Sequence, residues 1–185
     1  MSRPAGARVV LDRRALATAL AQERALGRSV VLANGCFDLL HAGHVRYLLG
    51  AAAEGDVLVV ALNADESVRR NKGAGRPLQP AADRVEMIAA MRCVDYVTVF
   101  PEPTADALLV ALRPDVHAKG TDWTAETVPE LATVRAIGAR VAIVGDPKTR
   151  SSSALVERVR RDVEDARGVA AGVDPADPAG AADTA

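Results

Sequence analysis

The chain has 185 residues, of which 49% are hydrophobic and 25% are charged, a composition typical of a globular protein with one buried core. The formal net charge is −1 and aromatic residues make up only 3%, which argues against a nucleic acid or an anionic membrane as the partner. No apolar run approaches the roughly 20 residues that a membrane-spanning helix needs. Residues 1–4 lack the apolar core of a signal peptide, so a cytoplasmic protein is expected.

The first half of the chain alternates helical and strand-like patterns. Residues 12–26 carry leucine and alanine at helical spacing, and residues 30–33 form an apolar strand that stops at a glycine turn. A helix is expected over 43–53 and a continuous apolar strand over 57–62. Residues 63–78 are polar, basic and glycine-containing, and they predict a long loop.

The second half repeats this alternation. The expected helices cover 81–91, 104–112, 127–137 and 151–162, and the expected strands cover 96–100, 115–118 and 140–144. Thr104 is the expected N-cap of its helix, because a threonine side chain there can accept a hydrogen bond from a free backbone N–H. Residues 119–123 are expected to form a loop after the 115–118 strand.

Strands that are apolar throughout are typical of a parallel sheet with helices on both faces. Their alternation with helices predicts right-handed crossovers and an α/β fold, a doubly wound, mostly parallel five-stranded sheet of the Rossmann-like type. This domain is expected over 11–166, after a flexible N-terminus at 1–10. Residues 167–185 are mostly Ala, Gly, Pro and Asp and predict a disordered tail, because they bury too little apolar surface to fold.

The turn after the first buried strand is the most informative segment of the chain. Residues 34–44 read Asn-Gly-Cys-Phe-Asp-Leu-Leu-His-Ala-Gly-His. A helix that starts near Ala42 would direct free backbone N–H groups and the positive end of its dipole at an anion. His41 and His44 would then project to one side and could donate hydrogen bonds to a phosphoryl group. The residues alone also fit a helix cap with a surface histidine, or two ligands of a metal, although the only other histidine is the distant His117.

The same segment resembles the His-x-Gly-His signature of the nucleotidyltransferase superfamily that includes cytidylyltransferases and some adenylyltransferases. The sequence Asn-Gly-Cys-Phe-Asp-Leu-Leu-His is similar to the motif of one branch, the heptose 1-phosphate adenylyltransferases of ADP-heptose synthesis. The resemblance runs from about Leu11 to about Val159. It implies transfer of AMP from ATP to heptose 1-phosphate with release of pyrophosphate. The alternative is a cytidylyltransferase that acts on glycerol 3-phosphate or another small alcohol phosphate.

The resemblance assigns roles to residues at the expected carboxyl ends of four strands, where ligands of such folds bind. The implied catalytic residues are His41, His44 and Lys72. The implied nucleotide-binding residues are Gly35, Cys36, Phe37, Gly43, His44, Asn63, Asp65, Arg84, Lys119, Gly120, Asp122, Ser151, Ser152 and Ser153. The implied substrate-binding residues are Asp38, Lys72, Arg76 and Trp123.

Simpler interpretations remain open for several of these residues. Lys72 could belong to a solvated charged loop, and Arg84 could be an exposed helical arginine paired with an acid. Trp123 could pack on the domain surface, in a loop that resembles the family's Lys-Gly-x-Asp-aromatic sequence. The serines at 151–153 suit an N-cap. They stand where the family has Ser-Thr-Thr, but residues 148–150 depart from the glycine-rich approach of relatives.

No nucleophile and base pair is evident, so direct in-line attack on the α-phosphorus of ATP is expected. Mg²⁺ is expected to enter on the ATP phosphates, with no dedicated metal site in the protein. The expected partners are ATP and a sugar 1-phosphate. A sugar kinase is expected on another chain, a homodimer is compatible with the sequence, and neither nucleic acid nor membrane is expected as a partner. A nonenzymatic nucleotide-binding module is the other class of protein that this fold would fit.

Overall fold

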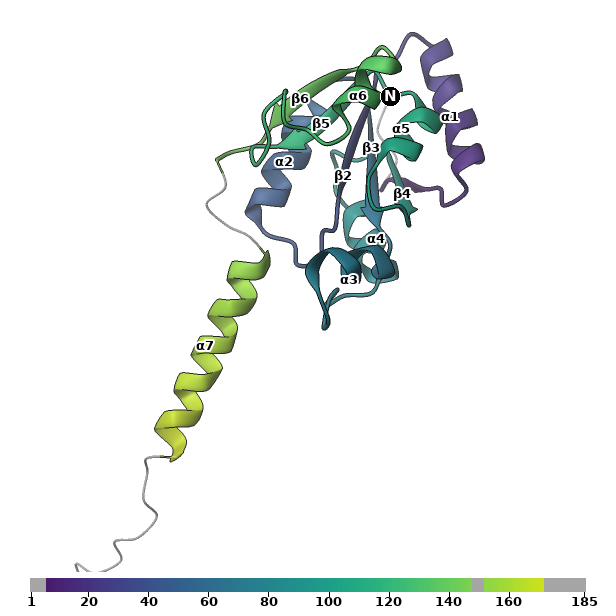
Figure 1. The fold of residues 1–185 in the computed structure, drawn as a ribbon. Helices are drawn as coiled ribbons and strands as arrows, with labels where there is room; N and C mark the ends of the chain where they lie inside the picture. Colours follow the sequence, from purple (N-terminus) through teal and green to yellow (C-terminus); the bar gives the residue numbers. More distant parts are fainter. Residues whose placement is uncertain (1–5, 148–151, 172–185) are drawn as a thin grey trace, which may run out of the picture. The chain divides into compact units, whose positions relative to one another are not determined.

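The computed structural model describes residues 6–147 and 152–171, and the chain divides into two units, 1–149 and 150–185. The first unit is built on a six-stranded sheet with the strand order β1-β4-β3-β2-β5-β6, in which every pairing is parallel (Figure 1). The strands are β1 (Arg8–Val9), β2 (Val30–Gly35), β3 (Val57–Asn63), β4 (Tyr96–Phe100), β5 (Val116–Gly120) and β6 (Arg140–Val144). The predicted doubly wound parallel sheet is confirmed, with one strand more than expected.

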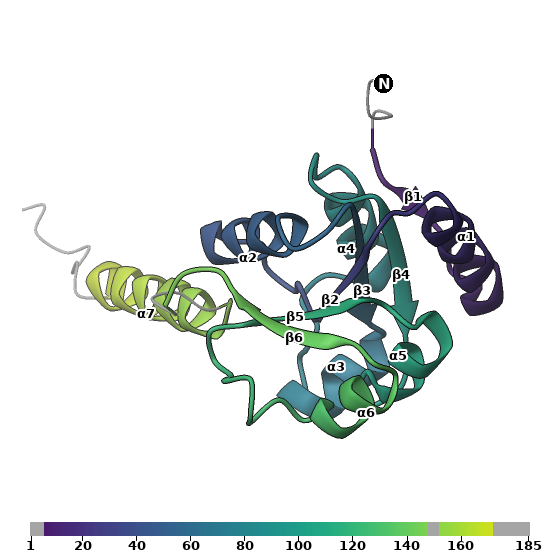
Figure 2. The same cartoon turned by 90° about the horizontal axis from the view of Figure 1, so that it is seen from above.

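Helices cover both faces of this sheet (Figure 2). They are α1 (Arg13–Ala25), α2 (Ala42–Ala52), α3 (Asp65–Lys72), α4 (Ala81–Ala89), α5 (Asp106–Leu112) and α6 (Leu131–Ala136). Leu48 of α2 and Ile88 of α4 pack in one core cluster, whereas α1, α5 and α6 contribute to the other. The two clusters exist because successive side chains of a strand point to opposite faces. Along β2, Val31 belongs to the first cluster and Leu32 to the second.

The order in which the chain adds strands to the sheet switches sides between β2 and β5. β3 and β4 lie to one side of β2, and β5 and β6 lie to the other. In open α/β sheets the crevice beyond the carboxyl ends of the strands at such a switch point is the usual ligand site. The residues that end β2, β3 and β5 therefore define where a site is expected.

The N-terminal segment differs from the prediction of flexibility over 1–10. Arg8 and Val9 pair in parallel with Tyr96 and Val97 of β4, and the Arg8 guanidinium lies 5.1 Å from the centre of the Tyr96 ring. A two-residue strand has no periodicity that a sequence pattern could reveal, because only its pairing with β4 defines it.

Four expected boundaries are also wrong within the first unit. The predicted loop over 63–78 contains α3, and the expected helix over 127–137 is shortened to Leu131–Ala136. Thr104 does not cap α5. Its hydroxyl donates to the Asp106 carboxylate at 2.6 Å, and Ala105 occupies the cap position. β5 continues through Lys119 and Gly120, because both residues pair with β6.

The second unit contains the helix α7 (Ser152–Ala171). It begins close to the predicted start at residue 151 and runs further than the predicted end at 162. Residues 167–171 are therefore helical, which corrects the prediction that the tail starts at 167. The rest of the predicted tail lies outside the described residues.

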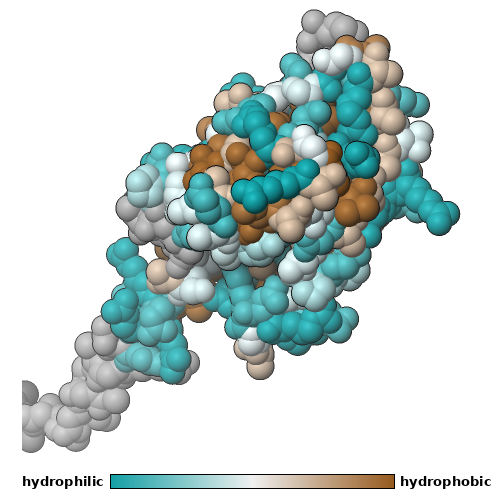
Figure 3. All heavy atoms as spheres, turned by 45° about the horizontal axis from the view of Figure 1, so that its top comes forward, coloured by the Kyte–Doolittle hydropathy of each residue, from teal (hydrophilic) through white to brown (hydrophobic). Residues whose placement is uncertain are grey.

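Hydrophobic side chains gather near the middle of the face that Figure 3 draws, with hydrophilic ones around them. In the first unit Leu11, Leu26 and Val110 are each more than half exposed. Over the described ranges, no helix combines the length and the apolar character that crossing a membrane requires. A homodimer, with which the sequence is compatible, stays a prediction.

Candidate active site

The turn between β2 and α2 is held by a buried aromatic residue in an unusual backbone conformation. Phe37 has a φ of 50°, in the left-handed region that side chains rarely adopt, and it is 2% exposed. Its ring lies 5.3 Å from that of His44 and 6.4 Å from that of Tyr47, measured between ring centres. A Cβ on Gly35 would lie 3.1 Å from the Phe37 ring, so a side chain there would push the ring away. The turn is thus packed onto the first turns of α2.

The two histidines of the turn lie against each other at the start of α2. His41 is the N-cap residue, and its carbonyl accepts from the backbone N–H of His44 at 2.9 Å. The two imidazole rings are stacked, with centres 3.8 Å apart and an angle of 22° between their planes. A Cβ on Gly43 would come within 2.9 Å of the His41 ring, which explains why residue 43 is a glycine. The expectation that both rings project to one side is confirmed.

Burial sets the protonation state of one of these rings. Desolvation, helped by His41 and by the positive charge of Lys72, lowers the pKa of His44 to about 4, while a hydrogen bond with the backbone of Leu39 acts in the opposite direction. His44 is therefore neutral near pH 7. Lys72, the last residue of α3, is exposed and close enough to act on this ring.

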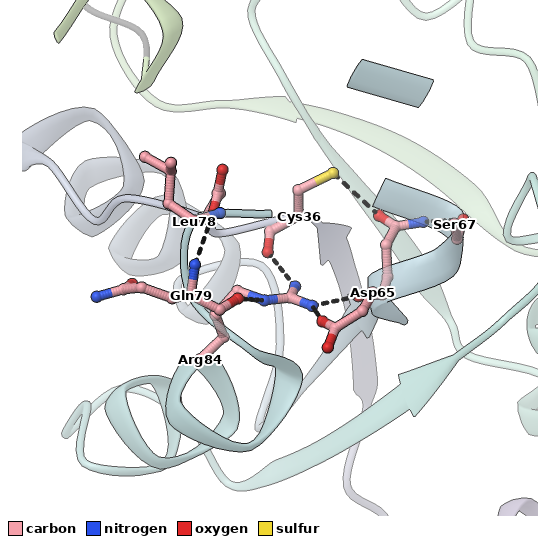
Figure 4. Close-up of polar contacts among 8 residues, drawn as sticks. Cys36, Asp65, Ser67, Leu78, Gln79 and Arg84 are labelled. Carbon is pink, nitrogen blue, oxygen red and sulfur yellow. Dashed lines mark hydrogen bonds and ion pairs between the residues drawn. The ribbon is translucent and has the colours of Figure 1, made fainter. Parts of the chain in front are cut away.

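Arg84 of α4 is buried and ties together the elements that form the turn. Its guanidinium donates to the backbone carbonyls of Gln79, Cys36 and Asn63 at 3.0, 2.5 and 2.9 Å (Figure 4). It also forms an ion pair with Asp65 at 2.7 Å. Arg84 is 0% exposed. Because the guanidinium is buried and occupied by these contacts, a role in holding the turn is favoured over a direct contact with phosphates, and the alternative of an exposed arginine is wrong.

Asp38 has a similar role for the segment that precedes α4. Its buried carboxylate accepts from Arg76 at 2.6 Å and from the backbone N–H groups of Leu78 and Gln79 at 2.7 and 3.2 Å. Burial acts to raise the pKa of Asp38, but these three hydrogen bonds outweigh it and hold the pKa below its usual range. The proposed substrate contacts of Asp38 and Arg76 remain predictions, because here the two side chains bind each other.

Cys36 directly follows β2 and Asn63 is the last residue of β3, and their side chains are in contact. The Cys36 thiol, labelled in Figure 4, donates weakly to the Asn63 side-chain oxygen at 3.7 Å, and the Asn63 amide donates to Ser67 at 3.4 Å. Burial raises the pKa of the Cys36 thiol, and the charges of Lys72 and Arg84 act against that rise. Cys36 is therefore a protonated, partly buried side chain near pH 7, and its expected contact with the nucleotide stays a prediction.

A second polar group lies at the end of β5, on the other side of β2. Lys119 is 8% exposed and forms an ion pair with Glu130 at 3.1 Å. Its ammonium group also donates to the Asn34 side-chain oxygen at 3.4 Å, and His117 contacts the same oxygen at 3.1 Å. The Trp123 ring centre lies 5.8 Å from the Lys119 nitrogen. Four polar residues thus meet where β2 and β5 end.

The loop after β5 carries the remaining candidates of this region. Trp123 is 39% exposed, which places an aromatic face at the surface beside Lys119. Thr121 donates to the backbone carbonyl of Asp146 at 2.7 Å and so ties this loop to the end of β6. Gly120 ends β5 with open space where a side chain would stand, and Asp122 follows it in the loop. Their nucleotide contacts stay predictions.

The serine candidates belong to the second unit. Ser151 lies outside the described residues, whereas Ser152 and Ser153 form the start of α7. Their proposed contact with nucleotide phosphates stays a prediction.

Three residues of the β5 region were missed by the sequence interpretation. The sequence pattern predicts no role for Asn34, His117 or Glu130, although all three contribute to the group around Lys119. Asn34 stood within the quoted motif, which was the available signal. Glu130 had no local signal, because its contact with Lys119 depends on how α6 packs beside β5.

No group of three or more His, Cys, Asp or Glu side chains suited to a metal ion occurs among the described residues. The interpretation of His41 and His44 as part of such a protein-built metal centre therefore has no support from neighbouring side chains.

Comparisons with known proteins point to one family. Residues 32–164 match the family described as cytidylyltransferase-like. The bifunctional protein HldE of Pelobacter propionicus is 45% identical over 150 residues, 81% of this chain and 31% of that protein. The HldE of Streptomyces coelicolor is 49% identical over 138 residues, 75% of this chain and 30% of that protein. The chain thus spans about a third of the length of these relatives.

One solved structure extends the match to the fold. The crystal structure of a lipopolysaccharide core biosynthesis protein from Thermoplasma volcanium superposes with a TM-score of 0.57 at 26% sequence identity. It covers 66% of this chain and 100% of that protein. Sequence similarity and structural similarity therefore both relate this chain to known proteins.

Proposed function

This chain belongs to the cytidylyltransferase-like family of nucleotidyltransferases, and we propose that it transfers AMP from ATP to heptose 1-phosphate, forming ADP-heptose and releasing pyrophosphate. The observation that carries the proposal is the stacked pair His41 and His44 at the start of α2, beside the positive charge of Lys72. The resemblance of residues 34–41 to the heptose branch supports this substrate, and so does the identity with HldE proteins.

The geometry favours direct transfer between the two substrates. An oxygen of the sugar phosphate attacks the α-phosphorus of ATP in line, a bond to that oxygen forms, and the bond to the leaving pyrophosphate breaks. The start of α2 offers backbone N–H groups to the phosphates, and Lys72 adds a full positive charge. His44 is neutral near pH 7, so it acts as a hydrogen-bond donor rather than as a cation. Rate acceleration then comes from positioning and charge stabilisation.

Two further parts of the proposal concern the metal and the second unit. Mg²⁺ bound to the ATP phosphates would neutralise part of the triphosphate charge, which suits a protein whose described residues form no metal cluster. The serines at the start of α7 would donate to the nucleotide phosphates, as the start of a 20-residue helix can.

The HldE relatives are named bifunctional, and the match covers about a third of each. A separate kinase would make the heptose 1-phosphate, both proteins would work in the cytoplasm, and the chain would act as a homodimer. Light scattering at several protein concentrations tests the homodimer.

Pyrophosphate release tests the proposed reaction. The protein is mixed with Mg²⁺ and either ATP or CTP, and with heptose 1-phosphate or glycerol 3-phosphate. We expect rapid release only with ATP and heptose 1-phosphate. Release only with CTP and glycerol 3-phosphate would establish the cytidylyltransferase alternative, and ATP binding without release for any acceptor would indicate a nonenzymatic module.

A further inference from the structure

The group at the end of β5 contains a buried ion pair that the proposed reaction does not explain. Lys119 and Glu130 are 8% and 3% exposed, and their charged atoms lie 3.1 Å apart. The other carboxylate oxygen of Glu130 accepts from the backbone N–H of Ala105 at 3.3 Å. The free energy needed to remove two charges from water can exceed the attraction between them. A buried ion pair of this kind therefore adds little to stability by itself. The pair also acts on the side chains around it.

The ion pair fixes the orientation of the Asn34 amide. A lysine ammonium group can only donate hydrogen bonds, so the atom of Asn34 that lies 3.4 Å from Lys119 is the oxygen. The same oxygen lies 3.1 Å from Nε2 of His117, which must then carry its proton there. Two donors therefore hold one end of the amide, and its NH₂ group must point away from both.

The NH₂ group of Asn34 is left for a ligand. No described residue accepts a hydrogen bond from it, and it is absent from the buried polar atoms that lack partners, so water reaches it. Asn34 is half-buried and stands next to the last residue of β2, at the switch point of the sheet. A fixed donor that water reaches at the switch point is well placed to bind a substrate.

The surrounding charge indicates what kind of group this donor would bind. Lys119 and Glu130 together carry no net charge, whereas the exposed Lys72 has no described acid within ion-pair distance. The phosphates are therefore drawn toward Lys72 and the start of α2. The Asn34 amide suits an uncharged acceptor atom, such as a ring nitrogen or a hydroxyl oxygen.

We infer that Asn34 is a binding residue that donates a hydrogen bond to an uncharged acceptor on one of the two substrates, and that Glu130 is a positioning residue which acts on it through Lys119. The inference rests on the proposed adenylyl transfer. The acceptor belongs either to the nucleoside of ATP or to the heptose ring, and separate KM values for the two substrates distinguish these sources.

Substitutions at Asn34 test the donor. Asn34→Asp keeps an oxygen for Lys119 and His117 but replaces the NH₂ group, and Asn34→Ala removes the donor without adding a charge. Both should raise the KM of the same single substrate by about tenfold or more, with kcat changed less, because one hydrogen bond is lost in ground and transition states alike. Unchanged KM values for both substrates in Asn34→Ala, or equal rises in both, would overturn the inference.

Substitutions at Glu130 test the positioning role. Glu130→Gln removes the counter-charge of Lys119 and leaves one acceptor oxygen where the carboxylate has two, so it should raise the same KM that Asn34→Ala raises, but by less than Glu130→Ala does. Glu130→Ala should raise the same KM that Asn34→Ala raises. Thr133→Ala is the matched control, because Thr133 lies in the same region and donates to Asp106 instead. A rise in neither KM in a folded Glu130→Ala protein, or the same rise in Thr133→Ala, would refute this role.

Turnover of the unmodified protein separates this inference from the proposed function. If the unmodified protein releases no pyrophosphate, calorimetric titration with ATP and with heptose 1-phosphate replaces the two KM values. Asn34→Ala should then weaken binding of only one of the two by about tenfold. Equal binding of both compounds to the variant and the unmodified protein would overturn the inference even in that case.

Discussion

The two lysines near the carboxyl ends of the strands stand in opposite surroundings. Lys72 is exposed at the end of α3, and its charge lowers the pKa of His44. Lys119 is almost fully buried at the end of β5, where Glu130 neutralises it. A buried cation needs a counter-charge, whereas an exposed cation keeps its field available to a ligand. The contrast indicates that the α2–α3 side binds phosphates and that the β5 side orients uncharged groups.

The largest expected effect comes from the histidine pair on the α2–α3 side. Replacement of both His41 and His44 by alanine should lower turnover by about 10³-fold or more, because preorganised donors to the transferring phosphoryl group are lost. Pyrophosphate release measures turnover, and circular dichroism shows whether the fold is retained. Arg46→Gln serves as the control on the same helix, because Arg46 is exposed and pairs with Asp146. Near-normal turnover of a folded double variant would contradict the assignment of phosphate binding to the α2–α3 side.

The next effect concerns stability on the β5 side. Lys119→Met should lower the free energy of unfolding by about 3–5 kcal/mol, because Glu130 is then buried without a partner. The double variant Lys119→Met with Glu130→Gln should recover more than half of that loss, since no charge remains uncompensated. Urea denaturation measures both values. A loss of less than about 1 kcal/mol in Lys119→Met, the range of surface pairs, would mean that the pair is not buried in solution.

Acid should weaken both sides of the site through their buried histidines. Burial, together with Lys119, lowers the pKa of His117 to about 4 from 6.5, and burial also lowers that of His44 to about 4. Between these values the unfolded chain binds more protons than the folded one, so stability is complete above pH 6.5 and falls toward pH 4. For the fully buried His117 the loss amounts to at most about 3 kcal/mol.

Urea denaturation at pH 7 and pH 5 measures this slope. His117→Asn should show a smaller difference between the two pH values than the unmodified protein does, because one of the two titrating groups is gone. An unchanged slope would show that His117 titrates normally in the folded protein, contrary to its burial.

Lys72 should affect activity without affecting stability. Lys72→Met should lower turnover by about 100-fold, because a charge near the transferring group is removed. Its free energy of unfolding should change by less than about 0.5 kcal/mol, as is usual for an exposed side chain. Arg69→Met, on the same helix and also exposed, is the control and should retain turnover within about twofold. A stability loss in Lys72→Met similar to that of Lys119→Met would abolish the distinction between the two lysines.

The sheet could be predicted from the sequence because its strands are apolar and separate. The bounds of β4 and β6 agree with the expected 96–100 and 140–144, and all seven residues of β3 are buried, as a strand covered on both faces requires. The helix α3 escaped prediction because its sequence is strongly polar and carries only one buried large apolar residue, Val68. Hydrophobic periodicity was therefore too weak to reveal it.

The candidate site was only partly predictable for a related reason. The stacking of His41 and His44 follows from their spacing at the start of a helix, which a sequence displays. The burial of Arg84 and the pairing of Lys119 with Glu130 depend on contacts between segments far apart in the chain. A charged residue carries no local mark of such a partner, so a sequence suggests an exposed side chain where the fold provides a buried one.

One measurement tests most directly whether the transfer proceeds without a covalent intermediate on the protein. The reaction is run with heptose 1-phosphate and a single diastereomer of ATP that carries sulfur on the α-phosphorus, and phosphorus NMR determines the configuration of the ADP-heptose formed. Direct in-line attack at a site made of positioning groups predicts inversion at the α-phosphorus. Retention of configuration would require two successive displacements through an adenylylated protein, and it would contradict the account.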